Sequence, residues 1–147
     1  MPAITIHVPE SRFDQGQKDE LAEDLTQVIL AIEGGADTPE GRSIAYVRFV
    51  ETPREDWYVG GKNDGTYMGA AGMFCIELNV PEGSMDQARK TMCHKAITKA
   101  VLKATGTSGK KGAANTVVIQ IFEWPEGHLA TRGRTACLLY TSDAADD

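Results

Sequence analysis

The chain has 147 residues with 15 Lys and Arg against 21 Asp and Glu, so its formal net charge of −6 argues against a generic nucleic-acid binder. The hydrophobic fraction of 41% suits one globular domain, and three cysteines at unrelated spacings favour neither disulfides nor a zinc site. No apolar run approaches the roughly 20 residues that span a bilayer, and the start lacks a secretory signal, so we expect a cytoplasmic protein without membrane contact.

The first half of the chain predicts a strand, a helix and a second strand. Residues 3–9 alternate between apolar and polar side chains, as a half-buried strand does. Asp14 and Gln17 have the spacing of a capping box, and apolar residues at helical spacing follow them. Residues 43–51 alternate again and predict a second strand, with a crossover long enough for parallel pairing with the first.

The second half repeats this plan with a strand, a helix and a strand, over residues 74–80, about 86–105 and 116–123. Between the halves, residues 57–59 and 66–68 flank Asn63-Asp64-Gly65, which predicts a hairpin. When the sequence is slid against itself, residues 4–10 align with 76–82, and the register then holds without a gap. We therefore expect a single domain of two repeats, about 2–62 and 74–134.

Two βαβ units related by pseudo-twofold symmetry predict an α+β fold, a four-stranded mixed sheet with both helices on one face. The uncovered face would expose Thr5, His7, Ala45 and Val47, or their opposites. Such a mixture is too apolar for a whole sheet face in water, so we expect a symmetric oligomer.

The last eleven residues do not fit this plan. Residues 137–147 resemble a translated sequencing adapter, a kind of segment that is set aside in fold analysis. We therefore expect the domain to cover residues 1–136 and the natural chain to continue differently from about Ala136. A genuine polar tail is the alternative.

Pro2 is a candidate general base because of its position. If Met1 is removed, Pro2 presents a secondary amine at the start of a strand. A free α-amino group titrates near about pH 7.7–8.0, and apolar or cationic surroundings lower its pKa further. If Met1 stays, Pro2 is an amide and has no basicity.

Three segments carry a resemblance to a known family. Pro2 opens the strand of residues 3–8, residues 10–15 follow with the sequence Glu-Ser-Arg-Phe-Asp-Gln, and residues 57–61 read Trp-Tyr-Val-Gly-Gly. With the duplication, residues 2–134 resemble the tautomerase superfamily, specifically fused members of the 4-oxalocrotonate tautomerase group. The resemblance implies a fold like that of macrophage migration inhibitory factor, a homotrimer, and an isomerase that needs no cofactor or metal. Its substrate would be a small unsaturated 2-hydroxy or 2-keto carboxylic acid.

The resemblance also assigns roles to residues of the first half. Pro2 matches the catalytic proline, and Arg12 matches an arginine that binds a substrate carboxylate. Trp57 falls at an aromatic wall position that keeps the proline amine dry. The family's second arginine aligns with Tyr46, and Arg48, two residues further on the same strand face, is its candidate substitute.

The second half is expected to be a scaffold, so that each chain has one site. Phe74 and Ser84 stand where the first half has its proline and its arginine. Two interpretations stay open for Arg132 and Arg134, which form either the rim of a pocket or a solvated terminus.

Two alternative functions stay open. Hydrolytic dehalogenases or hydratases of the cis-3-chloroacrylic acid dehalogenase type use a water-activating glutamate that aligns with Glu123, but Glu51 occupies the equivalent place in the first half. The histidine and two arginines of that type are replaced here by Ile29, Pro81 and Ser84. The second alternative is a non-catalytic trimeric scaffold, which the missing second arginine favours.

Overall fold

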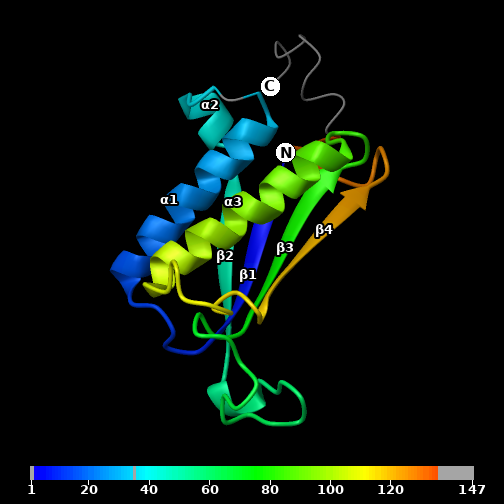
Figure 1. The fold of residues 1–147 in the computed structure, drawn as a ribbon. Helices are drawn as coiled ribbons and strands as arrows, with labels where there is room; N and C mark the ends of the chain where they lie inside the picture. The colour runs from blue at the N-terminus through cyan, green and yellow to red at the C-terminus, as the bar shows by residue number, and fades with distance from the viewer. Residues whose placement is uncertain (1, 35, 136–147) are drawn as a thin grey trace.

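The computed structural model describes residues 2–34 and 36–135 and confirms the predicted α+β fold (Figure 1). One mixed sheet has the strand order β2-β1-β3-β4 and contains β1 (Ala3–Pro9), β2 (Tyr46–Thr52), β3 (Phe74–Pro81) and β4 (Val117–Trp124). The pairs β1–β2 and β3–β4 are parallel, and the central pair β1–β3 is antiparallel. The two long helices, α1 (Gln15–Ile32) and α3 (Gln87–Thr105), lie together on one face of the sheet.

The two halves form their helices by the same local rule. The Asp14 side chain accepts a hydrogen bond from the backbone N–H of Gln17, whose own side chain accepts one from the backbone N–H of Asp14. The Asp86 side chain caps α3 by accepting from the backbone N–H of Arg89, and here the cap is this single hydrogen bond. These caps satisfy backbone donors that a helix start leaves without intrahelical partners.

The apolar core lies between the sheet and the helices. Alternate residues of the two central strands are fully buried there, namely Ile4, Ile6, Val8, Phe74, Ile76, Leu78 and Val80. They pack with the apolar stripes of α1 and α3 in one cluster. Val47 of β2 also packs against this cluster, so it faces the helices and leaves Tyr46 and Arg48 on the open face. Thr5 and His7 lie on the open face as expected, but Thr5 is buried, and Ala45 and Val47 pack against the core on the other face.

The shorter elements differ from two of the predictions. The predicted strand 43–51 begins only at Tyr46, because Thr38 and a proline start the short helix α2 (Pro39–Arg42), and its C-terminal turn includes residues 43–45. The predicted hairpin at Asn63-Asp64-Gly65 is wrong. The turn that reverses the chain lies at Gly60 and Gly61, between the paired residues Val59 and Lys62.

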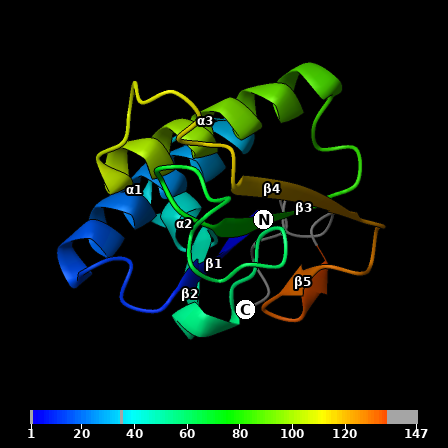
Figure 2. The same ribbon diagram turned by 60° about the horizontal axis from the view of Figure 1, so that its bottom comes forward.

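This chain reversal follows the 3-10 helix η1 (Arg54–Asp56). A second, similar chain reversal follows β4. There the strands β5 (Ala130–Thr131) and β6 (Arg134–Thr135) pair as a two-stranded hairpin. Figure 2 shows β5 on the side of the sheet opposite the helices. The pairs Val59–Lys62 and Thr131–Arg134 are related by the same shift that aligns residues 4–10 with 76–82, so equivalent structure recurs at the predicted offset.

Neither long helix of the described part of the chain is apolar enough to cross a membrane. The predicted tail, residues 137–147, lies outside the described residues. The division into repeats 2–62 and 74–134 stays a proposal that the recurring elements support.

Candidate functional site

The candidate residues lie at two opposite ends of the sheet. Pro2 is buried and directly precedes β1, whereas Arg12 follows the other end of that strand. An extended strand rises about 3.3 Å per residue, so Pro2 and Pro9 are roughly 23 Å apart. Figure 1 shows the N-terminus at one end of the sheet and the loop that contains η1 at the other. Within one chain, the structure therefore does not bring Pro2 and Arg12 together.

The Arg12 end is a half-buried cationic corner. The Nε and Nη2 atoms of Arg12 donate to the carbonyl oxygen of Ala71 at 3.2 and 2.9 Å, and the guanidinium lies 5.5 Å from the centroid of the Phe13 ring. Burial lowers the pKa of Arg12, and the positive charge of Arg54 lowers it further. Arg54 is itself held by the carbonyl oxygen of Glu10 at 2.9 Å. Two guanidinium groups close together favour an anion at this corner.

Trp57 directly follows η1, whose Arg54 is bonded to Glu10, so Trp57 belongs to the Arg12 end of the fold and not to the Pro2 end. Its indole N–H is buried and has no hydrogen-bond partner within the described part of the chain. A buried donor without a partner is costly, and a bound polar atom would remove that cost. Because Trp57 and Pro2 lie at opposite ends of the sheet, the expected role of Trp57 as a wall around Pro2 would require a second copy of the chain.

The Pro2 end gathers a different set of side chains. Ala3, the residue after Pro2, pairs with Tyr46 on one side and with Asn79 on the other. The hydroxyl groups of Tyr46 and Thr131 are 3.3 Å apart, and the indole N–H of Trp124 donates to the side-chain oxygen of Asn79 at 2.8 Å. The structure thus places Tyr46 near Pro2, with polar neighbours that the sequence did not suggest.

Ser84 belongs to the loop that leaves β3 at this end. Its hydroxyl oxygen is buried and has no hydrogen-bond partner among the described residues. Ser84 is the residue that aligns with Arg12 in the other repeat, and Arg12 contacts the segment just before β3. By the pseudo-twofold relation, Ser84 is expected to lie next to the segment just before β1, which contains Pro2.

Arg48 stands one step further along the open face. It pairs with Thr5 across β1 and β2, and its Nε atom donates to the Thr5 hydroxyl at 3.1 Å. Next to it, His7 Nε2 lies 3.3 Å from a carboxylate oxygen of Glu77. Arg48 is exposed and has no carboxylate partner among the described residues, so its charge is available to a ligand on this face.

Glu123 is turned away from the open face. It shares its side of β4 with Ile119 and Ile121, which pack against the helix-covered core, and its carboxylate lies 2.8 Å from the ammonium group of Lys90 in α3. Glu51 makes the same contact with Lys18 at 2.7 Å. A repeated ion pair accounts for this glutamate without any part in chemistry.

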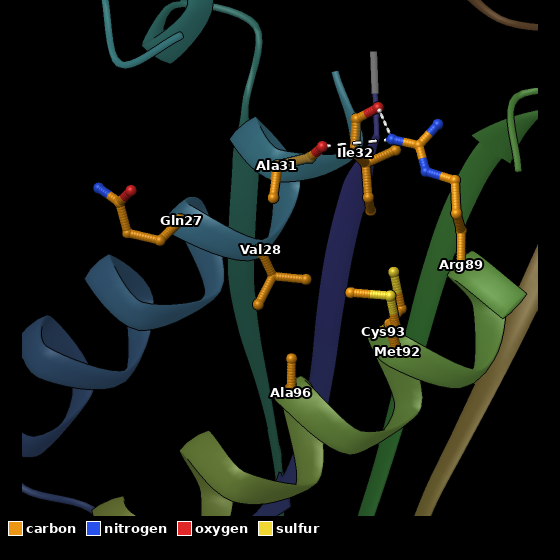
Figure 3. A pocket seen from close by; sticks show the side chains of 8 residues that line it. All are labelled: Gln27, Val28, Ala31, Ile32, Arg89, Met92, Cys93 and Ala96. Carbon is orange, nitrogen blue, oxygen red and sulfur yellow. Dashed lines mark hydrogen bonds between the residues drawn. The ribbon is translucent and has the colours of Figure 1, made fainter. Parts of the chain in front are cut away.

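A separate groove of about 300 Å³ runs between α1 and α3 (Figure 3). Its walls are mostly apolar, and Arg89 closes one end by donating to the carbonyl oxygens of Ala31 and Ile32 at 3.3 and 2.9 Å. Burial raises the pKa of the Cys93 thiol in its wall, which disfavours the reactive thiolate. The groove therefore offers no group suited to proton transfer or nucleophilic attack.

Among the described residues, no three His, Cys, Asp or Glu side chains come close enough to share a metal ion.

The sequence left the role of Arg132 and Arg134, in the β5–β6 hairpin, undecided. A signal for them existed, because the offset between the repeats aligns Arg132-Gly133 with Gly60-Gly61 and so places an arginine where the first repeat has a glycine.

Comparisons with known proteins agree with this architecture. The family model described as Tautomerase enzyme matches residues 2–66. No curated protein is significantly similar in sequence. Among solved structures, the F6 fused 4-OT, a wild-type asymmetric trimer, has a TM-score of 0.73 and 16% identity, covering 94% of this chain and 98% of its own.

Two further structures are similar at the same level. Pt0534 inactivated by 2-oxo-3-pentynoate has a TM-score of 0.74 and 15% identity, covering 94% of this chain and 98% of its own. N1, a member of the cis-3-chloroacrylic acid dehalogenase family, has a TM-score of 0.70 and 18% identity, covering 90% of this chain and 82% of its own. At these identities the structures establish the fold.

Proposed function

We propose that this chain, whose residues 2–66 match the Tautomerase enzyme family model, is a cofactor-independent tautomerase of the tautomerase superfamily, with the amino-terminal Pro2 as its general base. Its substrate is a small unsaturated 2-hydroxy or 2-keto carboxylic acid. The observation that carries the proposal is the burial of Pro2 at the head of β1, with Tyr46 and Asn79 beside the next residue. A buried secondary amine favours its neutral form, and neutral amine is the form that accepts a proton.

The reaction needs one base and a charged anchor. After Met1 is removed, the Pro2 nitrogen takes a proton from an enol O–H or an acidic C–H of the substrate and returns it to another carbon. In this proposal Arg48, on the open face, and the Tyr46 hydroxyl interact with the substrate's oxygens. These charge-assisted hydrogen bonds stabilise the enolate that forms between the two proton transfers.

Arg12 takes part only if another chain supplies it. The two ends of β1 are too far apart for Pro2 and Arg12 of one chain to hold the same small acid. We therefore include a homotrimer in the proposal, with Arg12 and Trp57 of one copy beside Pro2 of the next. The exposed apolar side chains of the open face and the trimeric state of the fused 4-OT structure support this assembly.

The dehalogenase alternative finds little support in the geometry. Its water-activating glutamate would be Glu123, which is held by Lys90 on the helix side of the sheet. The scaffold alternative predicts a folded, oligomeric protein without turnover.

The first test compares the purified protein with Pro2→Ala in the ketonisation of phenylenolpyruvate between pH 5 and 9. Intact mass must first show that Met1 is absent. We expect turnover that falls about 100-fold or more in Pro2→Ala, since a general base contributes at least that much. Unchanged turnover in the variant would contradict the role of Pro2, and a mature chain without turnover would favour the scaffold.

A second measurement locates the nucleophilic nitrogen directly. 2-Oxo-3-pentynoate, the compound named in the Pt0534 structure, carries a triple bond conjugated to a ketone. A neutral Pro2 amine adds to this triple bond, its proton moves to carbon, and no group leaves. We expect a mass increase of one reagent molecule on the Pro2 peptide of the wild type and none in Pro2→Ala.

A further inference from the structure

The segment after β4 crosses the sheet from edge to edge at the Pro2 end. It leaves β4 at Trp124 on one edge and reaches the start of β2 on the other edge, where Thr131 meets the hydroxyl of Tyr46. The next residue, Arg132, donates from Nη2 to the Ser43 hydroxyl at 3.5 Å. Figure 2 shows β5 of this segment on the open side of the sheet, away from the helices.

This position is at the same end of the sheet as Pro2. Ala3 pairs with Tyr46, the first residue of β2, and Ser43 lies three residues before Tyr46, in the turn after α2. With strands about 4.8 Å apart and at most about 3.3 Å per residue along the chain, Ser43 lies within roughly 18 Å of Pro2. A small carboxylic acid and the long Arg132 side chain can together span that distance, with the carboxylate at the guanidinium and the reacting carbon toward Pro2.

Several other cations at this end are already neutralised or capped. Arg42 is paired with the carboxylates of Glu23 and Asp37, and Lys90 is paired with Glu123. Arg89 is held by backbone carbonyl oxygens at the end of α1.

Arg132 differs from these cations. Its guanidinium makes one long hydrogen bond to a hydroxyl and, within residues 2–34 and 36–135, no ion pair. Arg132 is exposed, and a guanidinium without an acidic partner is available to an anionic ligand.

The backbone conformation of Arg132 also indicates a function for its side chain. Its φ of 54° lies in the left-handed region, which disfavours an arginine, and Gly60 has a φ of 59° at the equivalent place in the first repeat. The hairpin therefore carries an arginine where glycine is the residue that the backbone suits. Strain of this kind is a reason to look for a function of the side chain.

We propose that Arg132 binds the carboxylate of the substrate at the Pro2 site of its own chain. This inference rests on the proposed function and deepens it, since it supplies the second cationic group that the sequence lacks at Tyr46. The proposal predicts that the site selects the free acid, because Arg132 strengthens binding of the carboxylate and does not strengthen binding of the corresponding ester.

The test compares Arg132→Gly, Arg132→Lys and the control Lys95→Ala with the wild type. Glycine removes the cation and suits the left-handed turn, so Arg132→Gly should keep or raise the melting temperature. We expect its kcat/KM for phenylenolpyruvate to fall about 10- to 100-fold, mostly through KM, as the loss of one charged hydrogen bond implies. Arg132→Lys should recover part of this loss. Lys95 is an exposed residue of α3, and its substitution controls for the change in net charge.

The methyl ester of phenylenolpyruvate separates binding of the carboxylate from a structural effect. Arg132→Gly should lower turnover of the acid and leave turnover of the ester unchanged. Unchanged KM for the acid, or equal losses with acid and ester, would overturn the proposal.

Equilibrium binding keeps this inference separable from the proposed function. The saturated acid 3-phenylpropanoate cannot tautomerise, so its affinity can be measured in any variant. We expect Arg132→Gly to weaken its binding and Pro2→Ala to retain it. If Pro2→Ala keeps full turnover, the proposed function fails, while equal affinity in wild type and Arg132→Gly would overturn the role of Arg132 alone.

Discussion

The ammonium group of Lys90 lies 2.8 Å from the carboxylate of Glu123, and the same contact recurs at the equivalent place in the first repeat, between Lys18 and Glu51 at 2.7 Å. In both pairs the lysine stands near the start of a long helix and the glutamate near the end of the outer parallel strand. The two lysine side chains are each 25% exposed, and the glutamates are 32% and 33% exposed. The pair is therefore part of the repeated framework.

This relationship predicts that Glu123→Gln and Glu51→Gln behave alike. Each substitution removes one partly exposed ion pair, which is worth less than about 1 kcal/mol, so the melting temperature should fall by about 1–3 °C. Turnover of phenylenolpyruvate should stay within about twofold of wild type in both. Loss of turnover in Glu123→Gln alone would instead place Glu123 in the chemistry, as the dehalogenase alternative requires.

The cluster around Arg42 predicts an acid-sensitive contribution to stability. Hydrogen bonds from Arg42 and then Gln27 lower the pKa of Glu23 from 4.5 to about 2, and Asp37 is lowered to about 2 by the same two donors. A carboxyl whose pKa is depressed by folding adds stability above its unfolded pKa and loses it as the pH falls through its folded pKa. The contribution should therefore be complete above about pH 5 and vanish toward pH 2.

The measurement is the melting temperature of wild type and Glu23→Gln from pH 2 to pH 7. The difference between them should be largest at neutral pH and should shrink steadily below pH 5. Because these groups are exposed, 1 M NaCl should reduce the difference at neutral pH. A difference that does not change with pH would show that Glu23 stabilises the protein in some other way.

The open face predicts how the proposed trimer can be dissociated. Val118 and Phe122 of β4 are 41% and 40% exposed on the side away from the helices. Two lysines there would be forced together at an interface between copies, so Val118→Lys with Phe122→Lys should yield monomers in sedimentation velocity. Met92→Lys is the matched control, because Met92 is 68% exposed on the helical layer. A monomeric wild type, or dissociation by Met92→Lys as well, would contradict an interface on this face.

Local patterns in the sequence were sufficient for the framework. The capping box of Asp14 and Gln17 forms as predicted, and the alternation of residues 3–9 gives a strand buried on one side. The hairpin between the halves could not be predicted in this way. Asp64 binds the backbone N–H of Thr66 at 3.0 Å and makes only a local turn, while the chain reverses at Gly60 and Gly61.

The site was less predictable because sequence proximity does not imply spatial proximity in a strand. Pro2 and Arg12 are close in the sequence, yet β1 separates them along its whole length. Arg132 lies near the opposite end of the sequence from Pro2, yet it reaches the same end of the sheet through Ser43. Such long-range placement depends on the strand order and on the return of the final hairpin, neither of which a local pattern encodes.

A mixing experiment tests whether Pro2 and Arg12 of different copies share a site. Pro2→Ala and Arg12→Ala should each be inactive, because each removes one member of every site. In co-expressed mixtures, a site is intact when an Arg12→Ala chain provides Pro2 and its neighbour, a Pro2→Ala chain, provides Arg12. With random assembly, about one quarter of the sites meet this condition, so activity should return to about one quarter of wild type.

Each parent variant must first be shown to assemble, since Arg12 also holds the carbonyl oxygen of Ala71. Sedimentation velocity provides this control, and Arg12→Lys serves if Arg12→Ala does not fold. Assembled mixtures that stay inactive would show that Arg12 does not complete the Pro2 site of a neighbouring copy. The geometry of β1 excludes the remaining arrangement, in which one chain supplies both residues to one small substrate, so recovery of activity can only come from sites shared between chains.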